Sequence, residues 1–360
     1  MSARRAALTA AALALLGAGG CSTVGYYYQA AAGQWELVRA SRPLDAWIAD
    51  PATQPALRDK LHSVREIREF AARELGLPDN DSYRSYADLR RPYVVWNVVA
   101  AAEFSTRPKE WCFPFAGCVS YKGWFHEAEA QAAGRALAAE GYDSFVYGVP
   151  AYSTLGWFSD PVLNTYIHYP RQEIARLVIH ELAHQVAYVS GDSTFNESFA
   201  TFVEREGVRR WLDREGSERE REAFAAMDRY KRDFLALVLG TREKLDRLYA
   251  EDLSETGKRA RKAQAFAAMR ADYERLKVEW GGFSGYDRWF AQALGNAHVA
   301  SVATYTELVP AFEQLLHETG GDMPRFLAAV RALAEGRDTA RRDRIAALLE
   351  AAGHGQGAAR

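Results

Sequence analysis

Hydrophobic and polar positions change their period twice along the chain. Between residues 26 and 75, apolar residues recur at spacings of three and four, which predicts helices. From 92 to 170, segments rich in Val, Tyr, Phe and Trp are punctuated by Gly and Pro, as is typical of strands, with a predicted helix in EAEAQAAGRALAAEGY. After residue 171 the spacing is helical again, and the charged stretch 213–264 predicts long solvated helices packed on one side.

This order of elements predicts an α+β fold that is mainly helical. We expect a small mixed sheet, then a helix that carries two histidines, then a helical C-terminal part. The mixed α/β part should cover about residues 22–170 and the helical part about 171–350. The sequence shows no internal repeat.

Composition narrows the class of protein. The chain has 360 residues, of which 48% are hydrophobic, so it can bury a large core. Lys and Arg together number 45 against 47 Asp and Glu, so no excess of positive charge indicates a nucleic-acid partner.

The N-terminus has the pattern of a secretion signal. Two arginines precede an apolar run that ends at Cys21 and is too short and too rich in small residues for a good membrane-spanning helix. Small residues at 18–20 followed by Cys21 resemble the lipobox of bacterial lipoproteins, which implies a signal peptide over 1–20 and lipid on Cys21. Ser22 at the next position then implies the outer membrane, facing the periplasm. The alternative is an ordinary cleaved signal with an incidental cysteine.

Two cysteines remain in the mature chain, Cys112 and Cys118. Five residues that include a Pro and a Gly separate them, so in an oxidising compartment they predict a disulfide that closes a small loop. The alternative is a pair of buried free thiols. A zinc knuckle would need two further soft ligands, and none lies nearby in the sequence.

The stretch RLVIHELAHQVAYV carries the most specific pattern in the chain. His180 and His184 are four residues apart on a predicted helix, so both imidazoles project from one face and can reach a single ion. Glu181 is offset around the helix, where its carboxylate can accept a proton from water that zinc has acidified. The competing interpretation is a buried, hydrogen-bonded histidine pair without metal.

A third protein ligand is expected from a second helix. Gly191 should end the first helix and DSTFN should cap the next, so that the two helices form a hairpin. Glu197 and Glu204 then both lie near the histidines, and spacing alone does not choose between them. For Glu206 we expect a solvated surface position.

The motif HELAH followed by NESFATFVE resembles the gluzincin metallopeptidases. More closely, the chain resembles a bacterial family of zinc aminopeptidase lipoproteins, through GCSTVGYYYQAAAGQ, WCFPFAGCVSYKGWF, YGVPAYSTLGWFSDPVLNT, the zinc motif and GNAHVASVATYTELVPAFEQLL. The resemblance covers most of the mature chain. It implies Zn²⁺ bound by His180, His184 and Glu197, with Glu181 as the general base. Glu204, seven residues after Glu197 on the same face, could then hydrogen-bond the free ring nitrogen of a zinc-bound histidine.

Two further segments are candidates for contact with substrate. The predicted strand SFVYGVPAYSTLGWF would suit an edge strand that aligns an extended peptide, or it is an ordinary core strand. His298 and Tyr305 are seven apart and so on one face of a predicted helix, where either could donate to a developing oxyanion. We favour Tyr305; a buried hydrogen-bonded pair is the alternative.

These patterns together predict a metallopeptidase over residues 21–360 that hydrolyses peptide bonds with zinc-activated water. We expect an aminopeptidase with a peptide substrate, anchored to the membrane of the bacterial cell envelope by its N-terminal lipid. The alternatives are an endopeptidase, an amidase acting on cell-wall peptides, or a catalytically silent scaffold that binds zinc for stability.

Overall fold

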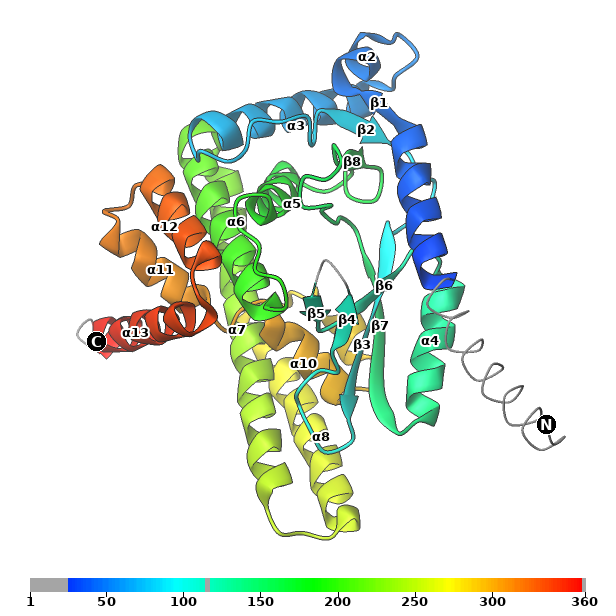
Figure 1. Cartoon of the computed structure of the whole chain (residues 1–360), viewed down its shortest axis with the longest axis vertical. Coiled ribbons are helices and arrows are strands. Elements are labelled where there is room, and N and C mark those ends of the chain that lie inside the picture. The colour runs from blue at the N-terminus through cyan, green and yellow to red at the C-terminus, as the bar shows by residue number, and fades with distance from the viewer. Residues whose placement is uncertain (1–24, 114–116, 358–360) are drawn as a thin grey trace, which may run out of the picture.

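The computed structural model describes residues 25–113 and 117–357 and has an α+β fold that is mainly helical, which confirms the predicted class (Figure 1). Within these ranges the strands form three small sheets, with the orders β1-β2-β8, β6-β3-β7 and β4-β5. The expected mixed sheet corresponds to the first of these, because β2 pairs antiparallel with β1 and parallel with β8. The other two sheets are antiparallel.

The described chain begins with a helix over residues 25–40, which we call the N-terminal helix. The helices that follow are α2 (Leu44–Ala49), α3 (Pro55–Arg73), α4 (Glu127–Ala139), α5 (Arg171–His184), α6 (Ser193–Glu215), α7 (Glu218–Ala250), α8 (Glu255–Glu279), α9 (Asp287–Phe290), α10 (Asn296–Thr304), α11 (Val309–Glu318), α12 (Met323–Glu335) and α13 (Asp338–Gly357). The strands are β1 (Ser41–Pro43), β2 (Ser85–Ala87), β3 (Val95–Ala102), β4 (Trp111–Phe113), β5 (Gly117–Val119), β6 (Lys122–Trp124), β7 (Tyr142–Val149) and β8 (Val162–Leu163).

The region predicted as helical over 26–75 is interrupted by the short strand β1. Pro43 ends this strand and precedes the first residue of α2, consistent with the restriction that proline places on a continuing helix. The rest of the region is helical apart from turns at 50–54 and 74–75, and the buried side of α3 presents Leu61, Val64 and Ile67 to the main core.

The sheet β6-β3-β7, which we call the central sheet, lies between helices on its two faces. Residues on β3 alternate, so that Trp96 and Val98 pack with Ala130 of α4, whereas Val99 packs with Ala297 of α10. β3 is the middle strand, which leaves β7 as an edge strand in this sheet. The face toward α10 is the one that reaches the candidate site.

Helices α5 and α6 form the hairpin that the sequence predicts, and both are largely buried in the main core. They approach closely at Gly207, where an added Cβ would lie 2.8 Å from Leu75 and 3.0 Å from Ile179. A larger residue at this position would therefore push α6 away from α5.

Helices α7 and α8 form a second, longer hairpin that projects from the body of the molecule (Figure 1). Ser217 caps α7 with a capping box and Ser254 caps α8. One side of the hairpin packs in its own hydrophobic cluster, which contains Phe234, Met269 and Trp280, while the other side is exposed. The charged stretch thus folds as long helices packed on one side, as predicted.

Among the described helices, none is both long and apolar enough to cross a membrane. The predicted signal peptide over 1–20 and the predicted lipidation site at Cys21 lie outside the described residues, so they remain predictions.

Candidate metal centre

Helix α5 places the two motif histidines side by side. The Nε2 atoms of His180 and His184 lie 3.2 Å apart, and both side chains are buried. One helical turn separates the two residues, so their rings project from the same face, as the spacing predicts.

The end of this helix differs from the prediction. Helix α5 ends at His184 rather than near Gly191, which lies in the connecting loop with φ +82°. The amide side chain of Asn196 explains how the loop is held: it accepts from the Val189 N–H and donates to the Val189 carbonyl, both at 2.8 Å. These two bonds replace helical partners that the Val189 backbone would otherwise need.

Helix α6 brings a carboxylate to the histidine pair. Asp192 caps the helix by accepting from the Phe195 N–H at 3.0 Å, which places Glu197 in the second turn from the cap. One oxygen of Glu197 lies 3.5 Å from His180 Nε2 and 3.6 Å from His184 Nε2. Ligand atoms of His180, His184 and Glu197 all lie within 4.8 Å of one another, and all three residues are buried. We call this group the His-His-Glu cluster.

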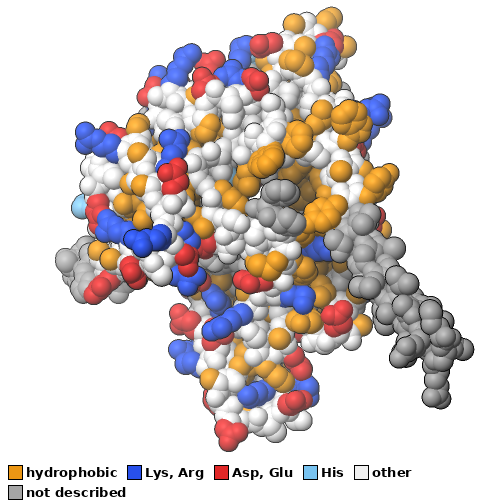
Figure 2. Space-filling view, in the orientation of Figure 1, with side chains coloured by type: hydrophobic (Ala, Val, Ile, Leu, Met, Phe, Trp, Pro, Cys, Tyr) orange, Lys and Arg blue, Asp and Glu red, His pale blue; other side chains and the backbone are white. Residues whose placement is uncertain are grey.

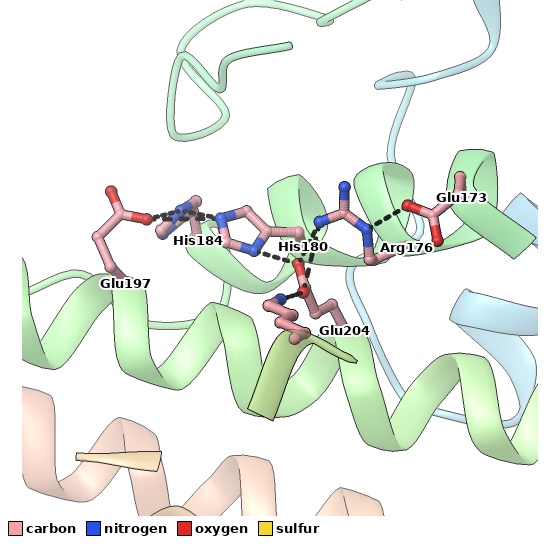
Figure 3. A network of polar contacts seen from close by, with 7 residues as sticks. Glu173, Arg176, His180, His184, Glu197 and Glu204 are labelled. Carbon is pink, nitrogen blue, oxygen red and sulfur yellow. Dashed lines mark hydrogen bonds and ion pairs between the residues drawn. The ribbon is translucent and has the colours of Figure 1, made fainter. Parts of the chain in front are cut away.

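Glu204 contacts the cluster from behind His180, as Figure 3 shows. One of its oxygens accepts from His180 Nδ1 at 2.8 Å, while Lys231 of α7 and Arg176 of α5 donate to the same carboxylate at 2.9 Å and 3.3 Å. Burial opposes ionisation, but the two cations hold the pKa of Glu204 well below its usual range. A carboxylate can only accept, so His180 donates from Nδ1 to Glu204, and its Nε2 faces Glu197 and His184.

Burial and the neighbouring charges act in opposite directions on the pKa values of the cluster. Burial alone would lower the pKa of His180, but Glu197 and Glu204 together raise it to about 10. The charge of His184 and the contacts with His180 lower the pKa of Glu197 to about 2 against the effect of burial. Two imidazoles with one carboxylate are a donor set that suits zinc.

Glu181 faces a different group of residues. Its side chain is buried, and burial raises its pKa. The charges of His180 and His184 lower this pKa, whereas those of Glu197 and of Asp160, a second buried carboxylate, raise it. Burial raises the pKa of Tyr83, and the charges of both carboxylates raise it further. Its buried hydroxyl has no hydrogen-bond partner among the described residues. A buried carboxylate with a raised pKa is a candidate for proton transfer.

Tyrosines from the central sheet and α10 surround Glu197. The Tyr121 hydroxyl donates to Glu197 at 3.4 Å. The Tyr147 side chain of β7 is hydrogen-bonded to both Asn97 and Tyr305, and the charge of Glu197 raises the pKa of Tyr305 further after burial has raised it. Phenol hydroxyls that stay protonated can donate hydrogen bonds beside the cluster.

His298 and Tyr305, the predicted pair, both lie against β7 but contact different residues there. Tyr305 follows the last residue of α10 and lies beside the cluster. His298 accepts from the Gly295 N–H through Nδ1 and stacks on Phe145 at 4.1 Å, so its contacts are with the hydrophobic layer between the sheet and α10. Tyr305 keeps an αR backbone as the C-cap of α10, so the spacing of seven still describes both positions, and the choice between them as donor stays a prediction.

The remaining predicted residues lie around the site or apart from it. Cys112 and Cys118 form a disulfide across the pair β4 and β5, as predicted. The neighbouring Gly117 packs so closely on the loop before α6 that an added Cβ would lie 2.5 Å from the Gly191 nitrogen. Glu206 is partly buried and pairs with arginines of its own helix, apart from the His-His-Glu cluster.

Sequence reasoning did not find several side chains that complete the site. Arg176 is four residues before His180, a spacing that could have indicated it. The others come from distant segments and carry no local pattern: Tyr83, Asn97, Tyr121, Tyr147, Asp160 and Lys231.

Comparison with known proteins gives one match. A family model described as "Putative aminopeptidase" matches residues 25–345. No curated protein and no solved structure matches the chain.

Proposed function

Because the chain belongs to the family described as "Putative aminopeptidase", we propose that it hydrolyses peptide bonds with the help of a zinc ion held by the His-His-Glu cluster. The observation that carries this proposal is the convergence of His180, His184 and Glu197, within 4.8 Å, next to the buried Glu181. Family membership favours removal of N-terminal residues over internal cleavage.

The cluster suits zinc better than a hard cation. Two imidazole nitrogens and one carboxylate oxygen match catalytic zinc sites, whereas Mg²⁺ and Ca²⁺ prefer sets of oxygen ligands. Three protein ligands also leave a position open for water or substrate. The hydrogen bond from His180 Nδ1 to Glu204 directs the ring and increases its basicity, as is typical of histidines that bind zinc.

When bound, zinc acidifies water and polarises a carbonyl group. Glu181 accepts the proton from the water that attacks the peptide carbonyl, and then passes this proton to the leaving amine. Tyr305 donates a hydrogen bond to the oxyanion that develops on the carbonyl oxygen. The edge strand β7 aligns the peptide by backbone hydrogen bonds.

The predicted location is part of the same proposal. Lipid on Cys21 holds the enzyme at the outer membrane, where it faces the periplasm and the peptides found there. Its substrates are peptides of the cell envelope, with a free N-terminus.

Metal analysis combined with a panel of peptides tests the proposal. We expect one zinc per chain and release of N-terminal residues from free peptides, with N-acetylated peptides of the same sequence left intact. Cleavage of both kinds of peptide would replace the aminopeptidase by an endopeptidase, and cleavage of cell-wall peptides alone would replace it by an amidase. Zinc without turnover on any peptide would contradict catalysis and favour a scaffold.

A further inference from the structure

The N-terminal helix is apolar on its exposed side as well as on its buried side. Its sequence, GYYYQAAAGQWELVRA, has only two charged residues, Glu36 and Arg39, both near its C-terminal end. A surface helix normally presents polar residues to water and apolar residues to the core. This helix therefore has a second apolar face that the rest of the described chain does not cover.

The buried face of the helix explains how it is held. Gln29 accepts from the Phe125 N–H at 2.9 Å, and Gly33 allows the Phe125 ring to pack directly on the helix backbone. Leu37, one turn further, enters the main core. These three residues follow a spacing of four, which orients the helix firmly.

The opposite face carries large aromatic side chains. Tyr28 is 75% exposed and Trp35 is 62% exposed, and they lie seven residues apart on one face, with the exposed Ala31 and Ala32 between them. Of the nine large hydrophobic side chains that are exposed among the described residues, this helix holds four: Tyr27, Tyr28, Trp35 and Val38. We call these four residues the aromatic face.

A neighbouring loop extends this surface. Tyr152 in the loop before β8 contacts Gln34 of the helix, and the same loop carries the exposed residues Trp157 and Phe158. Figure 2 shows hydrophobic side chains gathered over the helix and this loop, on the upper right of the molecule. By contrast, exposed hydrophobic residues on the α7 and α8 hairpin, such as Val278, lie singly among charged ones.

We propose that the aromatic face docks onto the surface of a lipid bilayer and fixes the orientation of the protein on the membrane. Tyr and Trp are the residues that prefer the level of the lipid headgroups, because each has an apolar ring and a polar tip. The face begins only a few residues after Cys21 and the apolar run that precedes it, so this part of the chain is the first to meet a bilayer that the N-terminus reaches. The aromatic side chains enter the boundary between headgroups and acyl chains, as in amphipathic helices that lie on membranes.

Another copy of the chain is a less suitable occupant. A stable interface between two proteins takes about 20 to 30 residues from each side, whereas this helix has nine exposed positions. A bilayer needs no complementary shape, and a few aromatic side chains can enter it independently.

Fluorescence quenching with the full chain tests the proposal. Vesicles of phosphatidylethanolamine and phosphatidylglycerol, brominated along their acyl chains, quench tryptophans that enter the bilayer. We expect the vesicles to quench the emission of Trp35, which is the difference between wild type and Trp35→Phe. They should also shift this emission to shorter wavelength. Trp280→Phe serves as the matched control, because Trp280 is buried in the α7 and α8 cluster and should contribute no quenched emission.

Three results would overturn the proposal. In the first, wild type and Trp35→Phe lose the same fraction of their emission to brominated vesicles. In the second, the lipid-free protein is a dimer that Tyr28→Ser with Trp35→Ser converts to a monomer, which would assign the face to a second copy. In the third, acrylamide fails to reach Trp35 in the lipid-free monomer, which would mean that the chain itself covers the face. Circular dichroism of each variant verifies that it is folded, and none of these readouts depends on zinc or on peptide hydrolysis.

Discussion

The Nδ1 atom of His180 lies 2.8 Å from a carboxylate oxygen of Glu204, across the hairpin of α5 and α6. This contact keeps a proton on Nδ1 of His180. It also links His180 to a third helix, because Lys231 of α7 donates to the same carboxylate at 2.9 Å. The orientation of the proposed metal ligand thus depends on packing between three helices rather than on α5 alone.

Substitution of the two glutamates on α6 should separate their roles. Glu197→Ala should abolish stoichiometric zinc binding, because it removes a ligand from the His-His-Glu cluster. Glu204→Ala should only weaken zinc affinity, by about 10- to 100-fold, since His180 keeps its nitrogen but loses the group that orients it. Zinc titration with a competing chelator measures both effects, and Glu206→Ala is the control on the same helix. A larger loss for Glu204→Ala than for Glu197→Ala would exchange the two roles.

Glu181→Gln should separate binding from chemistry. The variant should bind zinc as wild type does, because Glu181 is not one of the three converging residues. Its kcat should fall by at least about 10²- to 10⁴-fold, since the amide can neither accept the proton of the attacking water nor return it. Metal analysis and peptide hydrolysis are measured on the same preparation. Turnover close to that of wild type would remove Glu181 from the mechanism.

The central part of the site could be predicted from the sequence because it depends on local geometry. A spacing of four on a helix determines that His180 and His184 share a face, whatever the rest of the chain does. The capping residues before α6 similarly predicted the hairpin that carries Glu197. The helical spacing and the aromatic, Gly-punctuated segments predicted the fold class for the same reason.

The parts that could not be predicted depend on contacts between distant segments. The end of α5 at His184 follows from the bonds between Asn196 and Val189, which a search for a terminal glycine cannot reveal. Spacing places His298 and Tyr305 on one side of α10, but their different contacts, with Phe145 and with Tyr147, come from the distant strand β7. Tyr83 and Lys231 enter the site only through tertiary packing.

Asp160 should make stability depend on pH in an unusual direction. Burial raises its pKa from 3.8 to about 6, although Thr154 and Ser153 donate hydrogen bonds to it. Between these two values the folded chain binds a proton that the unfolded chain does not, so the contribution of Asp160 to stability grows as the pH falls from 7.5 to 5.

The measurement compares wild type with Asp160→Asn, which cannot titrate. Urea unfolding of the metal-free proteins gives a free energy of unfolding for each at both pH values. We expect the free energy of unfolding of wild type, relative to that of Asp160→Asn, to increase by about 1 kcal/mol from pH 7.5 to pH 5. A difference that is the same at both pH values would contradict the raised pKa.

The disulfide between Cys112 and Cys118 should contribute to stability rather than to chemistry. It closes a loop with a sequence separation of 6, for which the restriction of the unfolded chain predicts about 2 kcal/mol. Cys112→Ser with Cys118→Ser should lower the free energy of unfolding by that amount and leave zinc binding unchanged. Mass spectrometry of alkylated protein from the cell envelope, its proposed location, provides an independent measurement, and two free thiols there would contradict the bond.

Tyr305 and His298 should differ sharply when each is replaced. Tyr305 is the candidate donor to the oxyanion, because it lies beside Glu197 and its hydroxyl is linked through Tyr147 to Asn97. Tyr305→Phe should therefore lower kcat by about 10²- to 10³-fold while zinc affinity is retained, since one donor to a developing negative charge is removed. The substitution deletes only the hydroxyl, so packing beside the sheet is preserved.

His298→Gln provides the contrasting case, because His298 stacks on Phe145 and accepts from the Gly295 backbone. It should lower the free energy of unfolding by about 1 to 3 kcal/mol through the lost packing and hydrogen bond. The folded fraction should keep a kcat within a few-fold of wild type, because none of these contacts is with the His-His-Glu cluster. Steady-state kinetics, with kcat calculated per bound zinc, compare the two variants. If His298→Gln reduces kcat as strongly as Tyr305→Phe, the oxyanion cannot be assigned to Tyr305 alone, and α10 would have to supply both donors.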